Sequence, residues 1–450
     1  MDVTPETLIF VASTVAIIAF GLWHSWWHSK RTEARHMETL REARERGLDI
    51  PASLHPIIDP DICIGSAQCV RDCPEQDVLG LIAARGALLE AANCIGHGRC
   101  AAACPVDAIQ LVFGTATRGV ELPQVSGTFE SSVPGMYIVG ELGGMGLIAN
   151  AFEQAIQAME AIEVSLAEDR AQGADVDEGD DVLDVLVVGA GPAGLGAALR
   201  AKELGLSYAC IEQDTWGGAL RTYPRKKIVM TRPVRVPLYG PVKLRETTKE
   251  ALLELWEKVI EQTGVEIRNQ TKLLSATRRA GAFDIETSQG SLRARRVVLA
   301  IGRRGTPRKL GVPGEDGTNV TTRLIEVERW AGHRTVVVGG GDVAVEAALS
   351  LSEQEGTSVT LVHRGAVINR PKAKLRDQLT RAQECGDIEV LFESQVTDID
   401  QSRVLVGKKS GDGDAHELPC DQIFICIGGQ PPRALLQRLG VEMVTKYGEA

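Results

Sequence analysis

Hydrophobic and polar residues alternate in three different ways along this chain. An apolar run covers most of the first 29 residues, and a charge-rich stretch with helical spacing follows it. Further along, the short apolar segments 185–188 and 336–338 each lead directly into a glycine-rich turn and then into a helical pattern. A buried strand followed by a helix is typical of parallel α/β domains. The pattern therefore predicts an α/β protein with two such domains and a separate N-terminal helix.

The first apolar run is long enough to cross a bilayer, which takes about 20 residues. Residues 7–29 contain no Asp, Glu, Lys or Arg, and Trp23, Trp26 and Trp27 gather at the end where Lys30 and other cations follow. Aromatic residues beside cations are typical of the cytoplasmic membrane interface. We therefore expect a single transmembrane helix in a bacterial inner membrane, a solvated helical stalk and a cytoplasmic body. A cleaved signal or a buried helix fits less well, because no cation precedes the run and many charges follow it.

The composition indicates a large globular protein. With 450 residues, 44% of them hydrophobic and 24% charged, the chain is long enough for roughly three domains. Its formal net charge of -11 argues against nucleic acid as a partner, since phosphate contacts need clustered Lys and Arg. Six of its ten cysteines form two matched sets, which in a chain of this size predicts metal binding in a reducing compartment.

The two cysteine sets form an internal repeat with an offset of 31 residues. The first copy reads DPDICIGSAQCVRDCP and the second reads EAANCIGHGRCAAACP. This repeat resembles the bacterial ferredoxin run C-x2-C-x2-C-x3-C-P, in which the cysteine before proline binds the cluster of the other half. The second cysteine of that run is replaced here by Ser66 in one copy and by His97 in the other.

The resemblance implies an α+β ferredoxin domain with two iron-sulfur clusters. By its pattern, one cluster takes Cys63, Cys69 and Cys104, and the other takes Cys94, Cys100 and Cys73. Three thiolates suit a [3Fe-4S] cluster, or a [4Fe-4S] cluster whose fourth iron takes Ser66, His97 or water. Space filling by Ser66 and His97 is equally compatible with the sequence, and three Cys plus one His also fit a zinc site. The crossed spacing favours iron-sulfur over zinc.

The first glycine-rich turn is a dinucleotide-binding fingerprint. Gly189, Gly191 and Gly194 follow an apolar strand and open a helix, and Glu212 ends the next strand. Such glycines let backbone N–H groups approach a pyrophosphate, and the acidic residue accepts hydrogen bonds from ribose hydroxyls. Gly217 and Gly218 begin the next segment, in which Tyr223 and Met230 fit either flavin contacts or packing.

A second fingerprint contains Gly339, Gly341 and Ala344. The strand after it ends in His363 and Arg364 instead of an acidic residue. A cation at this place suits the 2′-phosphate of NADP, which a carboxylate would repel. Arg364, assisted by Arg370, is therefore the predicted phosphate contact, although either arginine could simply be solvated.

The segments VVLAIGRRGTPRKLGVPGE and DQIFICIGGQPP surround the second fingerprint. They resemble the two crossover strands of thioredoxin-reductase-like flavoproteins, in which a nicotinamide domain is inserted into a flavin domain. The resemblance implies FAD at the first fingerprint and NAD(P)H at the second. The chain lacks the C-x-x-C pair of disulfide reductases, so it is more similar to bacillithiol-disulfide-reductase-like proteins and to flavin reductases that serve ferredoxin.

One family segment stands out of order. The stretch SSVPGMYIVGELGGMGLIANAFEQAI, residues 131–156, resembles the segment that closes the flavin site at the C-terminus of that family. Glu141 follows Gly140 where the family has Asp, whose role is to bind the flavin ribityl chain. The chain stops at Ala450, where the family would continue into this segment. A circular permutation explains the order, and a swapped homodimer is the alternative.

The expected fold class is α/β: two Rossmann-like three-layer dinucleotide-binding domains, an α+β ferredoxin domain and an N-terminal transmembrane helix. The expected function is a membrane-anchored NAD(P)H:acceptor flavin oxidoreductase that passes electrons between NAD(P)H, FAD and two clusters, to or from an unknown redox partner. A disulfide or quinone reductase with accessory clusters, and a non-catalytic redox sensor, are the alternatives. The expected boundaries are 1–29 for the anchor, 30–54 for the stalk, 55–116 for the ferredoxin domain, 117–166 for the permuted segment, 167–181 for a linker, 182–312 for the FAD domain, 313–418 for the NAD(P) domain and 419–450 for the return to the FAD domain.

Overall fold

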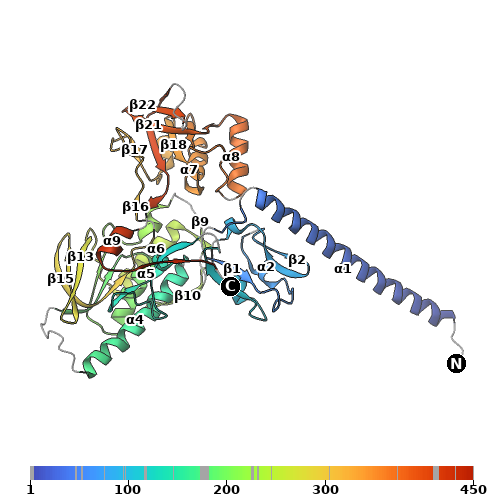
Figure 1. The fold of residues 1–450 in the computed structure, drawn as a ribbon, viewed down its shortest axis with the longest axis horizontal. Coiled ribbons are helices and arrows are strands. Elements are labelled where there is room, and N and C mark those ends of the chain that lie inside the picture. Colours follow the sequence, from blue (N-terminus) through green and yellow to red (C-terminus); the bar gives the residue numbers. More distant parts are fainter. Residues whose placement is uncertain are drawn as a thin grey trace. The chain divides into compact units, whose positions relative to one another are not determined.

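A computed structural model of the chain contains two compact units, residues 1–119 with 447–450 and residues 120–446 (Figure 1). The residues that the structure describes are 5–45, 48–51, 54–75, 77–94, 96, 98–115, 119–144, 146–172, 182–223, 228–230, 233–244, 246–303, 305–371, 373–408, 415–430 and 432–448.

The first unit combines one long helix with a small α+β body. Strand β1 pairs antiparallel with β4, and β2 pairs antiparallel with β3. Helices α2 and α3 carry Cys69 and Cys100, whose side chains are buried between the two strand pairs together with Val78 and Leu79. The elements are α1 (Pro5–Glu45), β1 (Leu54–Ile58), α2 (Gln68–Asp72), β2 (Leu79–Ile82), β3 (Arg85–Leu88), α3 (Arg99–Ala102) and β4 (Ile109–Phe113).

The N-terminal helix differs from its prediction in two respects. In the part of the chain that the structure describes, no helix is both long and apolar enough to cross a membrane, so the transmembrane segment expected over 1–29 is not supported. The side chains of α1 are described from Ser13 onward. Polar His24 and Ser25 interrupt the apolar residues of this part of the helix. The stalk is also not fully solvated, because His36 and Ala43 are buried against the body of the first unit.

A six-stranded sheet forms the centre of the second unit. Its order is β13-β14-β15-β7-β8, and β6 pairs with the end of β15. Strands β6, β15, β7 and β8 run parallel, whereas β13 and β14 are antiparallel to their neighbours. The bounds are β6 (Met136–Ile138), β7 (Val182–Val188), β8 (Tyr208–Ile211), β13 (Leu273–Arg279), β14 (Ala282–Thr287) and β15 (Gly290–Leu299).

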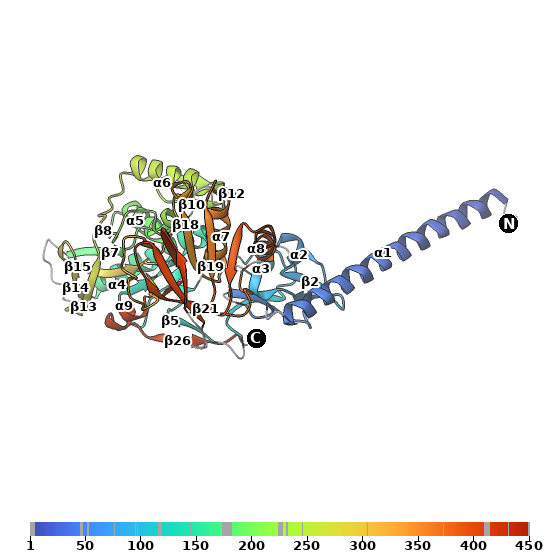
Figure 2. The same cartoon turned by 90° about the horizontal axis from the view of Figure 1, so that it is seen from above.

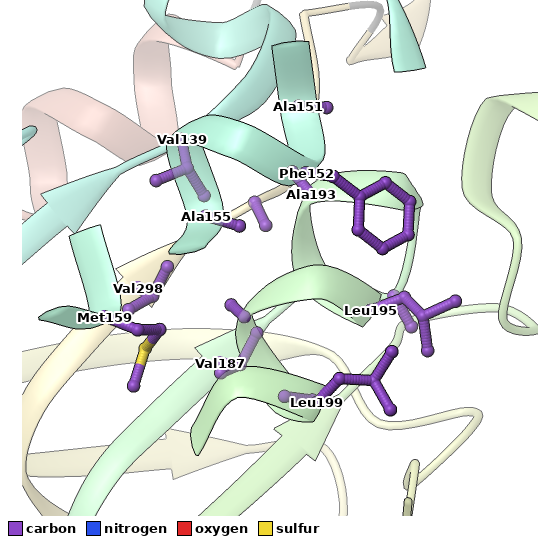
Figure 3. Packing of buried hydrophobic residues seen from close by; sticks show 14 of the residues in the cluster. Val139, Ala151, Phe152, Ala155, Met159, Val187, Ala193, Leu195, Leu199 and Val298 are labelled. Atoms are coloured by element: carbon purple, nitrogen blue, oxygen red, sulfur yellow. The ribbon is translucent and has the colours of Figure 1, made fainter. Parts of the chain in front are cut away.

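The out-of-order segment lies inside this sheet. Strand β6 pairs with β15 from Met136–Val297 to Ile138–Leu299, within the same chain. Helix α4 (Ile148–Ala171) then packs on α5 (Pro192–Glu203), as Figure 3 shows for the buried side chains of both helices. Gly196 permits this contact, because a Cβ there would lie 2.9 Å from the Phe152 ring. The single chain therefore contains the arrangement that the permutation hypothesis requires.

The C-terminal end of α4 is anchored to β15 by a buried arginine. Arg296 donates to Ser165 Oγ at 2.8 Å and to Asp169 Oδ2 at 2.5 Å, and its side chain is only 4% exposed. Arg170 also pairs with Asp184 at 3.1 Å. The linker expected to begin at residue 167 therefore begins later, since the helix and its anchoring contacts continue to Ala171.

A second parallel sheet, with order β17-β24-β18-β19-β20, forms the nicotinamide part of the second unit. The chain enters and leaves this sheet through the paired strands β16 and β25, and it forms a three-stranded sheet, β21-β22-β23, between β20 and β24. Helix α7 lies against β18 and β19 (Figure 2). Because β24 lies inside this sheet, the return expected at residue 419 occurs only after Cys426. The bounds are β16 (Thr306–Pro307), β17 (Val320–Thr321), β18 (Arg334–Gly339), α7 (Asp342–Ser352), β19 (Ser358–Val362), α8 (Ala373–Cys385), β20 (Ile388–Leu391), β21 (Ser394–Ile399), β22 (Arg403–Lys408), β23 (His416–Pro419), β24 (Gln422–Cys426) and β25 (Gly429–Gln430).

The remaining elements complete the second unit around the first sheet. The end of the chain returns to it through α9 (Arg433–Arg438) and β26 (Met443–Lys446), and β26 pairs antiparallel with β5 (Val120–Pro123). Helix α6 adds buried Trp256 to the core around α4 and α5. The other bounds are β9 (Ile228–Met230), β10 (Val234–Val236), β11 (Gly240–Val242), β12 (Glu246–Thr248) and α6 (Lys249–Thr263).

Candidate functional site

The first fingerprint forms a tight turn between β7 and α5. Gly189 has a positive φ of 102°, and a Cβ there would lie 2.6 Å from the carbonyl oxygen of Ala300. A Cβ at Gly194 would lie 1.7 Å from the carbonyl oxygen of Gly189, so the helix meets the strand more closely than any side chain permits. Helix α5 begins at Pro192, which needs no N–H partner at this place. The free N–H groups of the first turn form the cradle that a pyrophosphate needs.

Glu212 lies beside this turn, directly after β8. It is buried, and its two carboxylate oxygens accept hydrogen bonds from the backbone N–H groups of Ala190 at 2.8 Å and Asp214 at 3.0 Å. A carboxylate accepts about four hydrogen bonds, so capacity for ribose hydroxyls remains. Gly217 closes the site from the other side, since its N–H donates to the Ala190 carbonyl at 2.8 Å. Gly218, at φ +56°, lies against Gly191.

The permuted segment reaches the same turn. Gly140 has a φ of +78°, and a Cβ there would lie 2.9 Å from the Cβ of Ala193 in the first turn of α5. The Gly140 N–H donates to Gln154 Oε1 at 2.8 Å. Glu141 follows with an exposed side chain. The structure thus brings together the predicted residues from 140–141, 189–194 and 212–218, and this cradle of glycines and carboxylates fits the dinucleotide part of FAD.

Sequence reasoning missed Gln154, which holds the backbone at Gly140. Its side chain is buried on α4 among apolar neighbours that include Phe152 and Ala155. A polar residue on the apolar face of a helix is the signal that could have identified it, because a buried amide needs a hydrogen-bond partner.

The second fingerprint forms a similar turn between β18 and α7. A Cβ at Gly339 would lie 2.5 Å from the carbonyl oxygen of Cys426, and Ala344 is fully buried under the turn. His363, directly after β19, covers Gly340: its Nδ1 lies 3.0 Å from the carbonyl oxygen of Gly339, and a Cβ at Gly340 would lie 2.3 Å from the ring. His363 therefore has a packing role in this turn.

The two predicted phosphate contacts are exposed cations. Arg364 follows His363 at the carboxyl end of β19, the edge at which open α/β sheets bind ligands. Arg370 lies six residues further along the same connection. Of the candidates near the flavin, Tyr223 packs against the main core, and the Met230 side chain lies outside the described residues.

The first predicted thiol set lines one cavity. Cys63, Cys69 and Cys104 surround it, although Cys104 comes from the other sequence repeat. Backbone N–H groups point at two of the sulfurs, from Gly86 to Cys63 at 3.3 Å and from Ala108 to Cys104 at 3.3 Å. Such donors stabilise sulfur that carries negative charge.

Cys69 is the third thiol of this set, and burial has the largest effect on its pKa. Burial raises the pKa of Cys69, the Val70 N–H lowers it, and the neighbouring thiols Cys63 and Cys104 raise it further. Mutual repulsion of thiolates is the expected consequence when three of them face one cavity, and bound metal removes it by neutralising their charge.

The second thiol set also crosses between the repeats. Burial first, and then the charges of Cys94 and Cys73, raise the pKa of Cys100 to about 12, although the Ala101 N–H opposes this shift. The pKa of Cys73 is likewise raised by burial and, to a smaller extent, by Cys94. The structure thus brings Cys73, Cys94 and Cys100 together, as the ferredoxin pattern implies.

Ser66 and His97 stand where the ferredoxin run has its second cysteine, and of the two only Ser66 is among the described residues. Ser66 is exposed and lines the cavity of the first set, and its Oγ accepts from the Gln68 N–H at 3.5 Å. His97 lies outside the described residues. Among the residues that are described, no three Cys, His, Asp or Glu side chains form a group that could hold a single metal ion. The donor set on each side, three thiols with backbone N–H groups, fits an iron-sulfur cluster.

The four other cysteines belong to neither set. Burial raises the pKa of Cys210 to about 12, of Cys420 to about 11 and of Cys426 to about 12, so all three are protonated at neutral pH. Cys385 is exposed at the end of α8.

Comparisons with known proteins also separate an N-terminal iron-sulfur part from a C-terminal dinucleotide-binding part. Residues 186–448 match the family described as pyridine nucleotide-disulphide oxidoreductase, and residues 55–105 match a 4Fe-4S dicluster domain. The chain is 30% identical to a ferredoxin--NADP reductase from Ignicoccus hospitalis and 25% identical to the bacilliredoxin reductase Bdr from Bacillus subtilis, with 58% of this chain and 82% of the relative covered in each case.

The fold has a similar counterpart among solved structures. The bacillithiol disulfide reductase Bdr from Staphylococcus aureus aligns with a TM-score of 0.51 at 22% identity, and the alignment covers 60% of this chain and 85% of that one. At this identity the likeness establishes the fold alone.

Proposed function

Because this chain belongs to the pyridine nucleotide-disulphide oxidoreductase family and also carries a 4Fe-4S dicluster domain, we propose that it passes electrons between NAD(P)H, FAD and two clusters, to or from a redox partner. The chain is a flavin oxidoreductase by family. The electron path is the step that we add. The main observation behind this path is that one chain contains two dinucleotide turns and two thiol sets, and that each thiol set combines cysteines from both sequence repeats.

The chemistry of the groups makes this combination useful. A nicotinamide exchanges a hydride, an iron-sulfur cluster exchanges single electrons, and a flavin does both. Oxidation of one NAD(P)H releases two electrons and one proton, and two clusters can take one electron each. The path can also run in reverse, from a reduced partner to NAD(P)+.

The residues of the chain supply binding and orientation. The turn at Gly189–Gly194 would bind the FAD pyrophosphate and Glu212 the ribose, while Glu141 would bind the ribityl chain with one methylene more than the family's Asp. Arg364 and Arg370 would bind the 2′-phosphate of NADPH, and this favours NADPH over NADH. The exposed side chains of Glu141 and Arg364 support these roles.

The relatives' names suggest two kinds of partner, ferredoxin and a bacilliredoxin disulfide. We favour transfer through the clusters, because the second unit has no C-x-x-C pair and three of its four cysteines are buried thiols. A disulfide or quinone reductase would leave the clusters accessory, and a redox sensor would show negligible turnover.

Anaerobic stopped-flow absorbance with NADPH, followed by EPR of frozen samples, tests this proposal. We expect flavin bleaching first and cluster reduction afterwards, and we expect Cys100→Ser to abolish reduction of the second cluster while flavin bleaching persists. Cys385→Ser is the matched control, since that thiol is exposed and outside both sets. A reduced flavin beside clusters that stay oxidised would refute the electron path.

The cluster type is part of the proposal. We propose [4Fe-4S] clusters with three thiolates each, in which Ser66 and His97 supply the fourth ligand, and a [3Fe-4S] cluster is the alternative. Ser66 lining the first cavity supports this assignment. Mössbauer spectra of the wild type and of Ser66→Cys test it, because a site-differentiated fourth iron becomes equivalent to the others when it gains a thiolate.

A location at the bacterial inner membrane, with the body in the cytoplasm, is also a proposal. Its support is the exposed apolar surface of α1, where Ile17, Phe20 and Leu22 are 72%, 63% and 68% exposed. Membrane fractions washed with alkaline carbonate should retain the full chain and release one that lacks residues 1–29. A homodimer remains a prediction, which sedimentation would test.

A further inference from the structure

The hairpin of β2 and β3 connects helix α1 with the first cysteine of the first thiol set. Its two-residue turn is Ala83–Ala84, with φ values of +51° and +58°. In such a hairpin the residues next to the turn form a hydrogen-bonded pair, and the following pair does not. Leu81 and Gly86 are that following pair. Their backbone N–H and C=O groups therefore point outward, to opposite sides of the hairpin.

On one side, the hairpin contacts the loop that carries Cys63. The Gly86 N–H donates to Cys63 Sγ at 3.3 Å, and the Arg85 guanidinium donates to the Cys63 carbonyl. A Cβ at Gly65 would lie 2.1 Å from the carbonyl oxygen of Ala84, so the turn lies directly on this loop. The position of the hairpin consequently determines whether the Gly86 N–H reaches the sulfur.

On the other side, α1 holds the hairpin through two side chains. Nδ1 of His36 lies 3.0 Å from both the N and the O of Leu81, so either neutral tautomer makes one hydrogen bond to this residue. The ring of His36 also packs on Gly80, where a Cβ would lie 2.8 Å from it. Glu33 Oε1 accepts a hydrogen bond from the Ala83 N–H at 2.7 Å.

The turn needs such support from outside. Asn and Gly are the residues that tolerate positive φ at both positions of this turn, and alanine at both costs free energy. Glu33 satisfies the first N–H of the turn, and its own pKa is lowered by hydrogen bonds from Lys30 and from this N–H. The carboxylate is therefore ionised near neutral pH and makes a charge-assisted hydrogen bond.

We propose that Glu33 and His36 are positioning residues that set the reduction potential of the first cluster. They hold the hairpin where the Gly86 N–H meets Cys63 Sγ. A hydrogen bond to a cluster sulfur favours the reduced state, which carries one more negative charge, so losing it lowers the potential. This inference rests on the proposed clusters, and the second cluster, whose cysteines are not the ones that the hairpin contacts above reach, provides an internal reference.

Redox titration of the full chain, monitored by EPR, tests the inference, with Cys104→Ser used to assign the signal of the first cluster. We expect Glu33→Ala to lower the reduced-to-oxidised ratio of the first cluster at a fixed potential by roughly two- to tenfold, where tenfold corresponds to 59 mV for one electron. The second cluster should titrate as in the wild type. Glu33→Gln keeps an acceptor oxygen and should restore the wild-type value.

Glu38→Ala is the matched control, since it removes the same charge from α1, but among the described residues its carboxylate pairs with Arg41 of the same helix and not with the hairpin. Equal potentials of the first cluster in Glu33→Ala and Glu38→Ala would overturn the inference and leave the proposed function intact. A wild-type chain without cluster signals would instead refute the proposed function. Circular dichroism of each variant confirms that the compared chains are folded.

Discussion

A substitution in the contact between α4 and α5 provides the most direct test of the permuted flavin domain. Phe152 on α4 is fully buried, lies against Gly196 of α5 and has its ring centroid 5.0 Å from that of Trp256. Phe152→Ala removes these contacts and leaves a cavity, which typically costs about 3–5 kcal/mol. At about 2 °C per kcal/mol for a unit of this size, melting of the second unit should shift down by about 6–10 °C.

Release of FAD on heating, followed by its fluorescence, reports this transition. Val164→Ala is the matched control, because Val164 lies on the same helix and is 58% exposed, so its change should stay within about 0.5 kcal/mol. If Phe152→Ala melts and retains FAD like Val164→Ala, residues 117–166 are not part of the flavin domain core in solution. Sedimentation at the same concentration separates a permuted monomer from a swapped dimer.

Three further predictions concern the other parts of the chain. Arg364→Ala should raise KM for NADPH by about 10–100-fold, since a hydrogen bond to a charged group contributes about 1.5–3 kcal/mol, and leave KM for NADH unchanged; steady-state kinetics test this, with exposed Arg381→Ala of α8 as control. Cys104→Ser should remove the EPR signal of the first cluster although it lies in the second repeat, and loss of the second signal alone would contradict the crossed assignment. Arg334 lowers the pKa of Asp421 to about 2, so their pair stabilises the fold above about pH 4 and this contribution disappears as the pH falls through 2. Acid unfolding of Asp421→Asn should therefore lack that loss, which amounts to about 1 kcal/mol because the pair is partly exposed.

Local rules predicted the two glycine-rich turns. Both glycine turns were identifiable because backbone approach to a phosphate tolerates only glycine or alanine at fixed spacing, and both turns form as expected. The pairing of Cys104 with Cys63 and Cys69 followed from the ferredoxin resemblance, and the structure brings these thiols to one cavity. The repeat spacing alone would have grouped cysteines by proximity along the chain.

The errors occurred where burial depends on a distant partner. The charge-rich segment after residue 30 was expected to be solvated, yet His36 and Ala43 are buried because one side of α1 meets the β2–β3 hairpin. The linker was expected from residue 167 onward, but Asp169 pairs with Arg296, 127 residues later in the chain. Neither contact has a local signal, since each joins segments that are far apart in the sequence.

The sequence alone determined the types of site in this protein: two dinucleotide turns, two sets of three thiols and a flavin-closing segment out of its usual order. Each depends on residue type and short spacing, which backbone geometry and ligand chemistry restrict. Only the tertiary structure decided that Met136–Ile138 pairs beside Val297–Leu299, and that α1 reaches a hairpin in contact with Cys63. Those outcomes depend on packing between surfaces that fit one another in three dimensions, and local sequence does not encode that fit.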